Sequence, residues 1–143
     1  MQSLKIGSLN INGGRDRHKR ALISEVATQK KIDVLFLQET HTIQTDDTDW
    51  GLWWGGSCFL SHGSNLSAGG AILFSQHLIL SQVVVTDVEQ GRIQVVKATI
   101  RETPFVFVNV YAYTSAVDRI SLFHKLNDTL KQFSGSSVVV VGG

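Results

Sequence analysis

The sequence has one cysteine and one proline among 143 residues, and it has no long apolar run. The single cysteine, Cys58, excludes an internal disulfide and a cysteine-based zinc site, and it suits a reducing compartment. No stretch approaches the roughly 18 consecutive apolar residues that a membrane-spanning helix needs. Residues 1–10 alternate polar with apolar side chains, whereas a secretory signal has an apolar centre. These absences predict a nuclear or cytoplasmic protein without a membrane partner.

Motifs of several enzyme classes are missing as well. There is no G-x-S-x-G, Walker loop or dinucleotide fingerprint, so acyl transfer, nucleoside triphosphate binding and hydride transfer have no support. The five histidines show no H-x-x-x-H or comparable ligand spacing, and none can be nominated as a base. The composition, with 43% apolar and 17% charged residues, is typical of a globular protein. The length of 143 residues fits one domain or part of one.

The net charge of +1 conceals two stretches of opposite sign. Residues 15–31 carry six basic and two acidic side chains, a local charge of +4. Residues 33–50 carry five acidic side chains and no Lys or Arg, a local charge of −5. Two interpretations remain open: the charges are solvated on a helix and a loop, or they form a phosphate-contacting rim beside a pocket that collects metal ions.

Hydrophobic periodicity near the N-terminus predicts a strand followed by a helix. Residues 4–11 alternate in a strand-like period and a pair of glycines then breaks the run, so the strand ends near Asn12. Residues 17–31 have apolar side chains at helical spacing among charges, with Asp16 as a candidate N-cap. This segment is therefore expected to be an amphipathic helix.

The rest of the chain predicts a sheet with further strands and one more helix. Residues 34–37 form a continuous apolar run, typical of a strand buried on both faces, which leaves Glu39 at its C-terminal end. Residues 40–70 are expected to be loops around one short strand. A capping box at Ser115 and Asp118 begins the second helix. The predicted strands are residues 58–61, 71–75, 79–85, 92–100, 105–111 and 138–141, of which the second to fifth form an antiparallel meander, and the helix's apolar positions are Ile120, Phe123, Leu126, Leu130 and Phe133. This order fits helices packed outside a mixed sheet.

Polar side chains at three strand ends could carry chemistry on a phosphodiester. Mg²⁺ held by carboxylate or amide oxygens neutralises the charge of phosphoryl transfer, and Glu39 is the candidate ligand. Asn10 and Asn12 share one face of the first strand, and Asn109 and Tyr111 share one face of a later strand. Simpler interpretations stay open: an exposed glutamate, turn-forming asparagines and a packing tyrosine.

Five segments in order resemble motifs of the exonuclease-endonuclease-phosphatase superfamily. They are Leu9-Asn10-Ile11-Asn12-Gly13, Asp33-Val34-Leu35-Phe36-Leu37-Gln38-Glu39-Thr40, Gly69-Gly70-Ala71-Ile72-Leu73, Asn109-Val110-Tyr111-Ala112 and residues 138–143. Within the superfamily, the opening Asn-Ile-Asn-Gly and the run Gln-Glu-Thr-His look most like the apurinic-type endonuclease domain of non-LTR retrotransposons. The resemblance covers essentially the whole chain.

The resemblance implies an α/β fold, a two-layered α/β sandwich of the deoxyribonuclease I type. It implies an Mg²⁺-dependent, DNA-nicking endonuclease, in which Glu39 is the metal ligand, Asn10 lies next to the metal and Tyr111 contacts the scissile phosphate. Asn12 stands where many relatives carry Asp, and a neutral amide at this position either lowers the metal affinity a little or leaves the residue to contact phosphate only. After the tyrosine many relatives continue Ala-Pro-Asn, whereas this chain has Ala-Tyr113-Thr, so this loop is expected to have another shape.

Basic residues near these motifs are candidate DNA contacts, namely Arg15 after the first strand and Arg119 at the start of the second helix. Relatives follow the glycine pair that corresponds to Gly142 and Gly143 with Asp and Asn. Later in their sequence comes an Asp-His pair that supplies the base. Residues 1–143 are therefore expected to be the N-terminal portion of a single domain, truncated before its C-terminal strands, inactive alone and prone to self-association through exposed sheet edges. The alternatives are a phosphatase or nuclease of this fold acting on another phosphoester, a non-catalytic nucleic-acid-binding remnant, and a degenerate remnant without function.

Overall fold

The computed structural model describes residues 3–133, 135 and 137–143, and residues 1, 2, 134 and 136 lie outside this description. The N-terminal sheet contains strands β1 (Ile6–Asn10), β2 (Val34–Gln38), β3 (Cys58–Ser61) and β4 (Gly70–Phe74). Its order is β1-β2-β4-β3, with β1 parallel to β2 and β4 antiparallel to both its neighbours. The C-terminal sheet contains β5 (Ser81–Glu89), β6 (Ile93–Ile100), β7 (Thr103–Val110) and β8 (Val138–Gly142) in sequential order. Its first three strands form an antiparallel meander, and β8 is parallel to β7.

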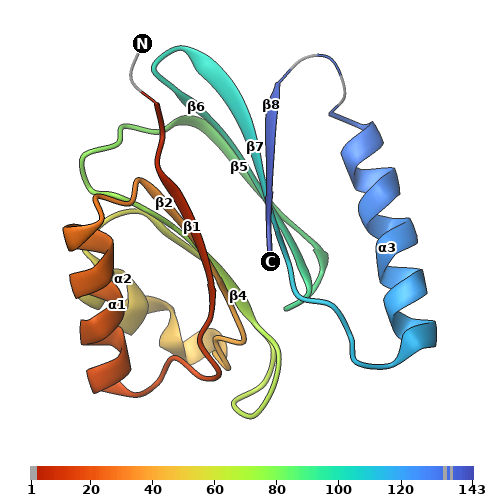
Figure 1. Ribbon diagram of the computed structural model, residues 1–143, viewed down its shortest axis with the longest axis horizontal. Coiled ribbons are helices and arrows are strands. Elements are labelled where there is room, and N and C mark those ends of the chain that lie inside the picture. Colours follow the sequence, from red (N-terminus) through yellow and green to blue (C-terminus); the bar gives the residue numbers. More distant parts are fainter. Residues whose placement is uncertain (1–2, 134, 136) are drawn as a thin grey trace.

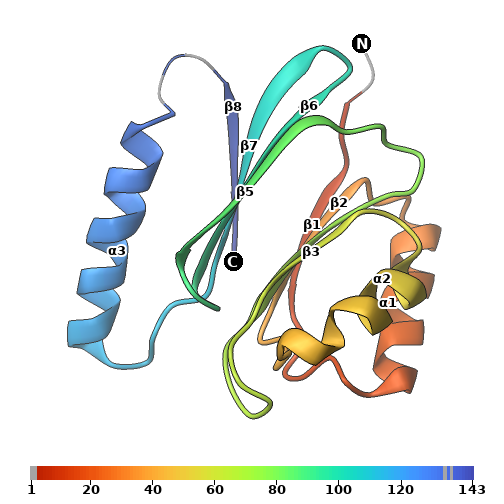
Figure 2. The same cartoon turned by 180° about the vertical axis from the view of Figure 1, so that it is seen from behind.

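The two sheets stack face to face, and the helices lie on their outer faces (Figure 1). The helices are α1 (Arg17–Gln29), α2 (Asp47–Trp54), which follows a 3₁₀ turn (Gln44–Asp46), and α3 (Ala116–Lys131). Figure 2 shows the same sandwich from behind, with α1 and α2 on the N-terminal sheet and α3 on the C-terminal sheet. The predicted sandwich is confirmed, with two stacked sheets in place of one mixed sheet. In the described part of the chain, no helix is long and apolar enough to cross a membrane.

Three apolar clusters correspond to the three interfaces between these layers. Between the sheets lie the aromatic rings Phe36, Phe74 and Phe107, with aliphatic side chains around them. Under α1 and α2 lies a second cluster around Trp50, and under α3 a third around Leu122. Strands β2 and β4 are buried along their whole length, because they face one cluster on each side.

The predicted first helix is confirmed. The carboxylate of Asp16 accepts a hydrogen bond from the backbone N–H of His18 at 2.8 Å, so the N-cap forms as expected. Ile23 and Ala27 are buried against the N-terminal sheet, whereas Leu22, from the same predicted apolar face, is 61% exposed. The apolar stripe is therefore wider than the surface that the helix covers.

Helix α2 was not expected, because residues 40–70 were predicted to contain loops and one strand. The short strand is found at Cys58–Ser61, as predicted. Eight residues are too few for a helical period to be recognised, and the helix is stabilised by contacts distant in sequence. Trp50 is fully buried, and its ring packs edge-on to that of Trp53 at 5.1 Å between centroids.

Three details of the predicted C-terminal half were wrong. Strand β4 belongs to the N-terminal sheet, so the meander has three strands, because periodicity does not tell which of two stacked sheets a buried strand joins. The Ser115 side chain makes no capping bond to the helix. Helix α3 packs Leu122 and the predicted positions Leu126, Leu130 and Phe133 against the C-terminal sheet, whereas the predicted positions Ile120 and Phe123 are 60% and 48% exposed.

Candidate active site

The candidate residues lie at one end of the sandwich, the lower end in Figure 1, where three strands terminate. Asn10 is the last residue of β1 and is paired with Gln38, the last residue of parallel β2. Glu39 follows directly, and Tyr111 follows the last residue of β7. Because β7 packs across the sheet interface from β2 and β4, the two sheets bring Asn10, Glu39 and Tyr111 together.

The backbone around Glu39 is held by hydrogen bonds on both sides. The carbonyl of Glu39 accepts from the N–H of Gly13 at 2.6 Å, and the N–H of Thr40 donates to the carbonyl of Gly69 at 3.3 Å. Glu39 has a φ of +56°, and Asn12 nearby has a φ of +46°. Asparagine adopts left-handed backbone readily, but for glutamate it is unfavourable and is found mainly where the surrounding structure imposes it, often at functional sites. The fold thus fixes the backbone position from which the Glu39 side chain projects.

The Glu39 carboxylate lies in a polar cluster. Burial raises the pKa of Glu39, but hydrogen bonding to Asn10 and Tyr111 and the nearby His41 lower it by more, so the pKa is below its usual value. The Nε2 atom of His41 is 3.6 Å from Glu39 Oε1 and has no hydrogen-bond partner. Glu39 is therefore ionised at neutral pH and carries the charge that a cation needs.

Tyr111 is the aromatic member of the cluster. Burial and the neighbouring Glu39 carboxylate raise the pKa of Tyr111, and the positive charge of Arg92 offsets only part of this rise. The phenol therefore keeps its proton and serves as a hydrogen-bond donor at neutral pH.

A buried amide network beneath the cluster joins the two sheets. Asn109, which is 3% exposed, donates through Nδ2 to the carbonyls of Leu37 at 2.8 Å and Ala71 at 3.2 Å. Its Oδ1 accepts from Gln38 Nε2 at 3.0 Å. A side chain at Gly70 would put Cβ 2.9 Å from Asn109 Nδ2, so the paired glycines leave room for this amide. The network holds the ends of β2 and β7 at a fixed distance.

The other predicted contacts lie around this centre. Asn12 is exposed, and its N–H donates to Asn10 Oδ1 at 3.2 Å. Arg15 lies 3.5 Å from Asp46, and Arg119 on α3 donates to the carbonyl of Thr114 at 3.1 Å. Their roles in DNA binding stay predictions.

The two oppositely charged stretches partly neutralise each other. Arg20 of α1 is buried, with its guanidinium bonded to the carboxylate of Asp49 on α2 and, through Nε at 2.6 Å, to the carbonyl of Gly14. Arg15 and Asp46 form a second such pair. These contacts attach α2 and the loop after β1 to α1, so part of the predicted charge pattern is structural.

The donor atoms fit an oxygen-bound cation. The Glu39 carboxylate, whose side chain is 23% exposed, accepts a hydrogen bond from the side-chain amide of Asn10, and the Asn10 Oδ1 accepts from the N–H of Asn12. Mg²⁺ is often bound through one or two carboxylates, with water and substrate phosphate as further ligands. Among the described residues no group of three or more His, Cys, Asp or Glu gathers as a metal cage.

Two residues of this region, Arg92 and Tyr113, were missed by the sequence analysis. The guanidinium of Arg92 lies over the rings of both Tyr111 and Tyr113. A signal for Arg92 did exist: the predicted strands 92–100 and 105–111 are antiparallel neighbours, which places Arg92 opposite Tyr111. The observed pairing of Ile93 with Val110 confirms that register.

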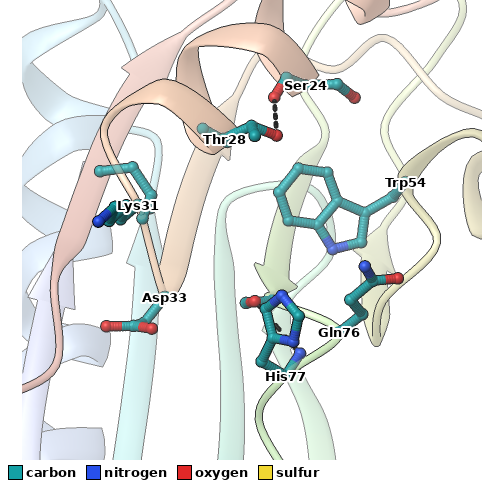
Figure 3. Close-up of a pocket in the computed structure, with 10 residues that line it drawn as sticks. Ser24, Thr28, Lys31, Asp33, Trp54, Gln76 and His77 are labelled. Carbon is teal, nitrogen blue, oxygen red and sulfur yellow. Dashed lines mark hydrogen bonds between the residues drawn. The ribbon is translucent and has the colours of Figure 1, made fainter.

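A separate pocket of about 440 Å³ lies at the opposite end of the N-terminal sheet (Figure 3). It lies near the start of β2, at Asp33, and the end of β4, and none of the predicted site residues lines it. In Figure 3 the ring of Trp54 forms one wall, with His77 beside it. The pocket is therefore distinct from the Glu39 cluster.

Comparison with known proteins agrees with this geometry. The model of the endonuclease/exonuclease/phosphatase family matches residues 7–143. A protein from Xenopus laevis, the transposon TX1 uncharacterized 149 kDa protein, is 29% identical over 141 residues, which is 99% of this chain and 11% of that protein.

Solved structures show the same fold. A humanized D. rerio TDP2 superposes with a TM-score of 0.72 at 14% identity, over 97% of this chain and 61% of that one. An AP endonuclease from Archaeoglobus fulgidus superposes with a TM-score of 0.69 at 20% identity, over 98% of this chain and 56% of that one. The 3′ phosphatase NExo from Neisseria, bound to a product DNA hairpin, superposes with a TM-score of 0.70 at 21% identity, over 97% of this chain and 57% of that one. The chain thus spans a little over half the length of these structures and about a tenth of the transposon protein.

Proposed function

We propose that this chain, which belongs to the endonuclease/exonuclease/phosphatase family, is the metal-binding N-terminal portion of an Mg²⁺-dependent, DNA-nicking endonuclease domain of a retrotransposon. Members of the family are hydrolytic nucleases and phosphatases, and they generally use divalent metal ions. The observation that carries the proposal is the cluster of Asn10, Glu39 and Tyr111 at one end of the sandwich. The likeness to a transposon protein supports the retrotransposon origin.

Each residue of the cluster has a chemical role in this proposal. Glu39, ionised and fixed by its backbone, would hold Mg²⁺, with Asn10 beside it. When bound, the ion neutralises charge on the phosphate and on the leaving oxygen. Tyr111, which keeps its proton, donates to a phosphate oxygen. Asn12, Arg15 and Arg119 are proposed to contact phosphates of the DNA backbone.

DNA is the proposed partner. One solved neighbour, a D. rerio TDP2, is complexed with a single-strand DNA product, and the Neisseria phosphatase is bound to a product DNA hairpin. Because the chain spans 45–61% of the TDP2, AP endonuclease and NExo structures, we propose that the rest of such a domain supplies the base that activates water. The 143 residues alone are then expected to be inactive. A nuclear or cytoplasmic location is likewise proposed, supported by the single cysteine.

A plasmid-nicking assay tests the reaction. A form of the protein that includes the rest of the domain should convert supercoiled plasmid to open circles with Mg²⁺, and Glu39→Ala should lower the rate by at least about 100-fold. Glu25→Ala is the matched control, because this glutamate is exposed on α1. Equal cutting by Glu39→Ala and wild type would reject the proposal.

Metal binding can be measured on the chain itself. Terbium luminescence sensitised by nearby aromatic rings, with competition by Mg²⁺, reports the affinity. Glu39→Gln should weaken binding about 10- to 100-fold, whereas Glu25→Gln should leave it unchanged. Identical titrations for wild type and Glu39→Gln would place any metal elsewhere.

A second candidate function is hydrolysis of another phosphoester, favoured by the likeness to a 3′ phosphatase. Comparing turnover of supercoiled plasmid, an abasic-site duplex, a 3′-phosphorylated hairpin and inositol phosphates distinguishes the two. Salt-dependent DNA binding without turnover of any of them would instead indicate the non-catalytic nucleic-acid-binding alternative.

We also propose that the chain self-associates through an open edge, defined as the apolar residues exposed on the edge strands β1 and β8. These two strands lie on the same side of the sandwich (Figure 1). The residues of the open edge are Ile6, Leu9, Val138, Val139 and Val141, each at least 36% exposed. Unpaired edge strands with apolar side chains favour pairing with another chain.

A further inference from the structure

The guanidinium of Arg92 lies between the rings of the only two tyrosines in the sequence. Its central carbon is 4.0 Å from the ring centre of Tyr113 and 4.7 Å from that of Tyr111. Its Nη1 atom donates to the carbonyl of Ala112, between the tyrosines, at 3.2 Å. A planar guanidinium is attracted to aromatic faces and directs its N–H groups in a fixed plane. Arg92 is therefore held by two ring faces and by one edge.

The backbones of Arg92 and Tyr111 are joined directly. The N–H of Tyr111 donates to the carbonyl of Arg92 at 2.8 Å, next to the paired residues Ile93 and Val110. This bond fixes where the Tyr111 side chain begins, but it does not fix the rotation of the ring. Contact with the Arg92 guanidinium supplies that second constraint.

Tyr113 is anchored by an acidic side chain that is itself paired with a lysine. Its hydroxyl interacts with the carboxylate of Glu89 at the end of β5. Glu89 is paired with Lys125 of α3, with Nζ 2.7 Å from Oε1. The ring of Tyr113 also packs in the apolar cluster under α3. This tyrosine is thus held between the end of β5 and helix α3.

We propose that Tyr113 is a positioning residue, which presses the Arg92 guanidinium against the Tyr111 ring and thereby holds the Tyr111 hydroxyl beside Glu39. The proposal deepens the function proposed above and depends on it only for the effect on catalysis. The packing itself stands on the distances between the three side chains.

A consequence for the reaction follows from this packing. A donor that is already oriented does not have to reorganise when substrate binds, and small misplacements of reacting groups are costly in rate. Without the Tyr113 ring, one face of the guanidinium opens to water and Arg92 can leave the Tyr111 ring. The Tyr111 hydroxyl then loses its fixed direction toward Glu39.

NMR of the 143-residue chain tests the packing. Tyrosine labelled with ¹³C in the ring gives only two spin systems, and Arg92 side-chain protons between two rings should be shifted upfield and show nuclear Overhauser effects to both. In Tyr113→Leu the effects between Arg92 and the Tyr111 ring should weaken by at least about half, and the Tyr111 ring signals should move. Tyr113→Phe, which keeps an aromatic face, should restore them. Unchanged Tyr111 and Arg92 signals in Tyr113→Leu would overturn the proposal.

Two further variants separate positioning from simple loss of folding. Phe123→Leu makes the same aromatic-to-leucine change on the exposed side of α3 and should leave the Tyr111 signals unchanged. Arg92→Lys keeps the charge but not the planar group, and it should move the Tyr111 ring signals while the Tyr113 ring stays packed. If Tyr113→Leu does not fold, Arg92→Lys decides, and an unmoved Tyr111 ring there also rejects the proposal.

Kinetics test the catalytic consequence in a form that nicks plasmid. Tyr113→Leu should lower kcat about tenfold with KM for DNA unchanged within about twofold, because a misplaced donor affects the transition state more than binding. Tyr113→Phe should recover most of kcat. A Tyr113→Leu enzyme with wild-type kcat would overturn the positioning role. If Glu39→Ala fails to impair nicking while the NMR contacts are present, the proposed function fails and the packing remains.

Discussion

The two sheets of this protein differ in how completely their outer faces are covered. The N-terminal sheet has two helices, α1 and α2, whose side chains form a closed cluster around the fully buried Trp50. The C-terminal sheet has one helix, and both its edge strands, β5 and β8, are largely exposed, whereas in the N-terminal sheet only the edge strand β1 is. Glu39 belongs to the closed sheet, whereas Tyr111, Arg92 and Tyr113 belong to the open one. The proposed metal ligand thus rests on the sheet covered by two helices, and the groups that would meet the phosphate rest on the sheet covered by one.

The largest effect is expected from emptying the closed cluster. Trp50→Ala should lower the free energy of unfolding by about 3–5 kcal/mol, because it leaves a cavity beneath two helices. Leu122→Ala under α3 removes a smaller side chain and should cost about 2–4 kcal/mol. Urea unfolding followed by circular dichroism measures both.

The control for that comparison is Leu52→Ala, since Leu52 lies on the same helix as Trp50 and is 77% exposed. It should change the stability by less than about 0.5 kcal/mol. A larger loss for Leu122→Ala than for Trp50→Ala would reverse the assignment of the closed and open sheets.

The next effect concerns the contact between the sheets. Asn109→Ala removes the bonds to two buried carbonyls and one of the two bonds made by the Gln38 amide, so it should cost about 2–4 kcal/mol. The same unfolding experiment measures this cost. The control is Asn127→Ala on the exposed face of α3, which should change the free energy of unfolding by less than about 0.5 kcal/mol. A cost equal to the control would show that the network does not join the sheets.

A smaller, pH-dependent effect is expected at Cys58 in the closed sheet. Burial, with a contribution from Asp47, raises the pKa of the Cys58 thiol to about 12. The unfolded chain loses this proton near pH 8.5, whereas the folded chain keeps it, so stability should fall as pH rises above about 8.5. Cys58→Ala should remove that part of the decline.

The same thiol gives a kinetic measurement. Because the thiolate is the reactive form, alkylation of folded Cys58 by iodoacetamide at pH 8 should be slower than in urea by at least about 100-fold. Equal rates in both solvents would mean that β3 opens readily, and the N-terminal sheet would no longer be the closed one.

The smallest effect on stability is expected at the open edge. Val139→Lys on β8 should change the unfolding free energy by less than about 0.5 kcal/mol, yet a lysine on an edge strand opposes pairing and should shift a self-associated species to monomer in sedimentation velocity. Val84→Lys on β5 makes the same change on the opposite edge and should leave association intact. If only Val84→Lys dissociates the protein, the interface lies on the other side.

Much of the site could be predicted because it depends on local signals. A buried apolar run has to end somewhere, and the polar residue at its end, Glu39, is visible in the sequence. Parallel pairing of β1 and β2 then brings Asn10 to the same edge. The partners of these residues are distant in sequence: Asn109 lies 71 residues from Gln38, and such contacts have no local pattern.

Sequence pattern alone established the α/β class, the strand ends and the chemical identity of the candidate ligands, because periodicity and turn residues act over a few neighbouring positions. Folding in three dimensions assigned β4 to one sheet, ordered α2 around Trp50 and set Arg92 between two tyrosines. The reason is that these features depend on which surfaces meet across the core, and a single chain pattern is compatible with several such arrangements. The cluster around Glu39 joins both kinds of information, since local signals supply its residues and the stacking of the sheets supplies its geometry.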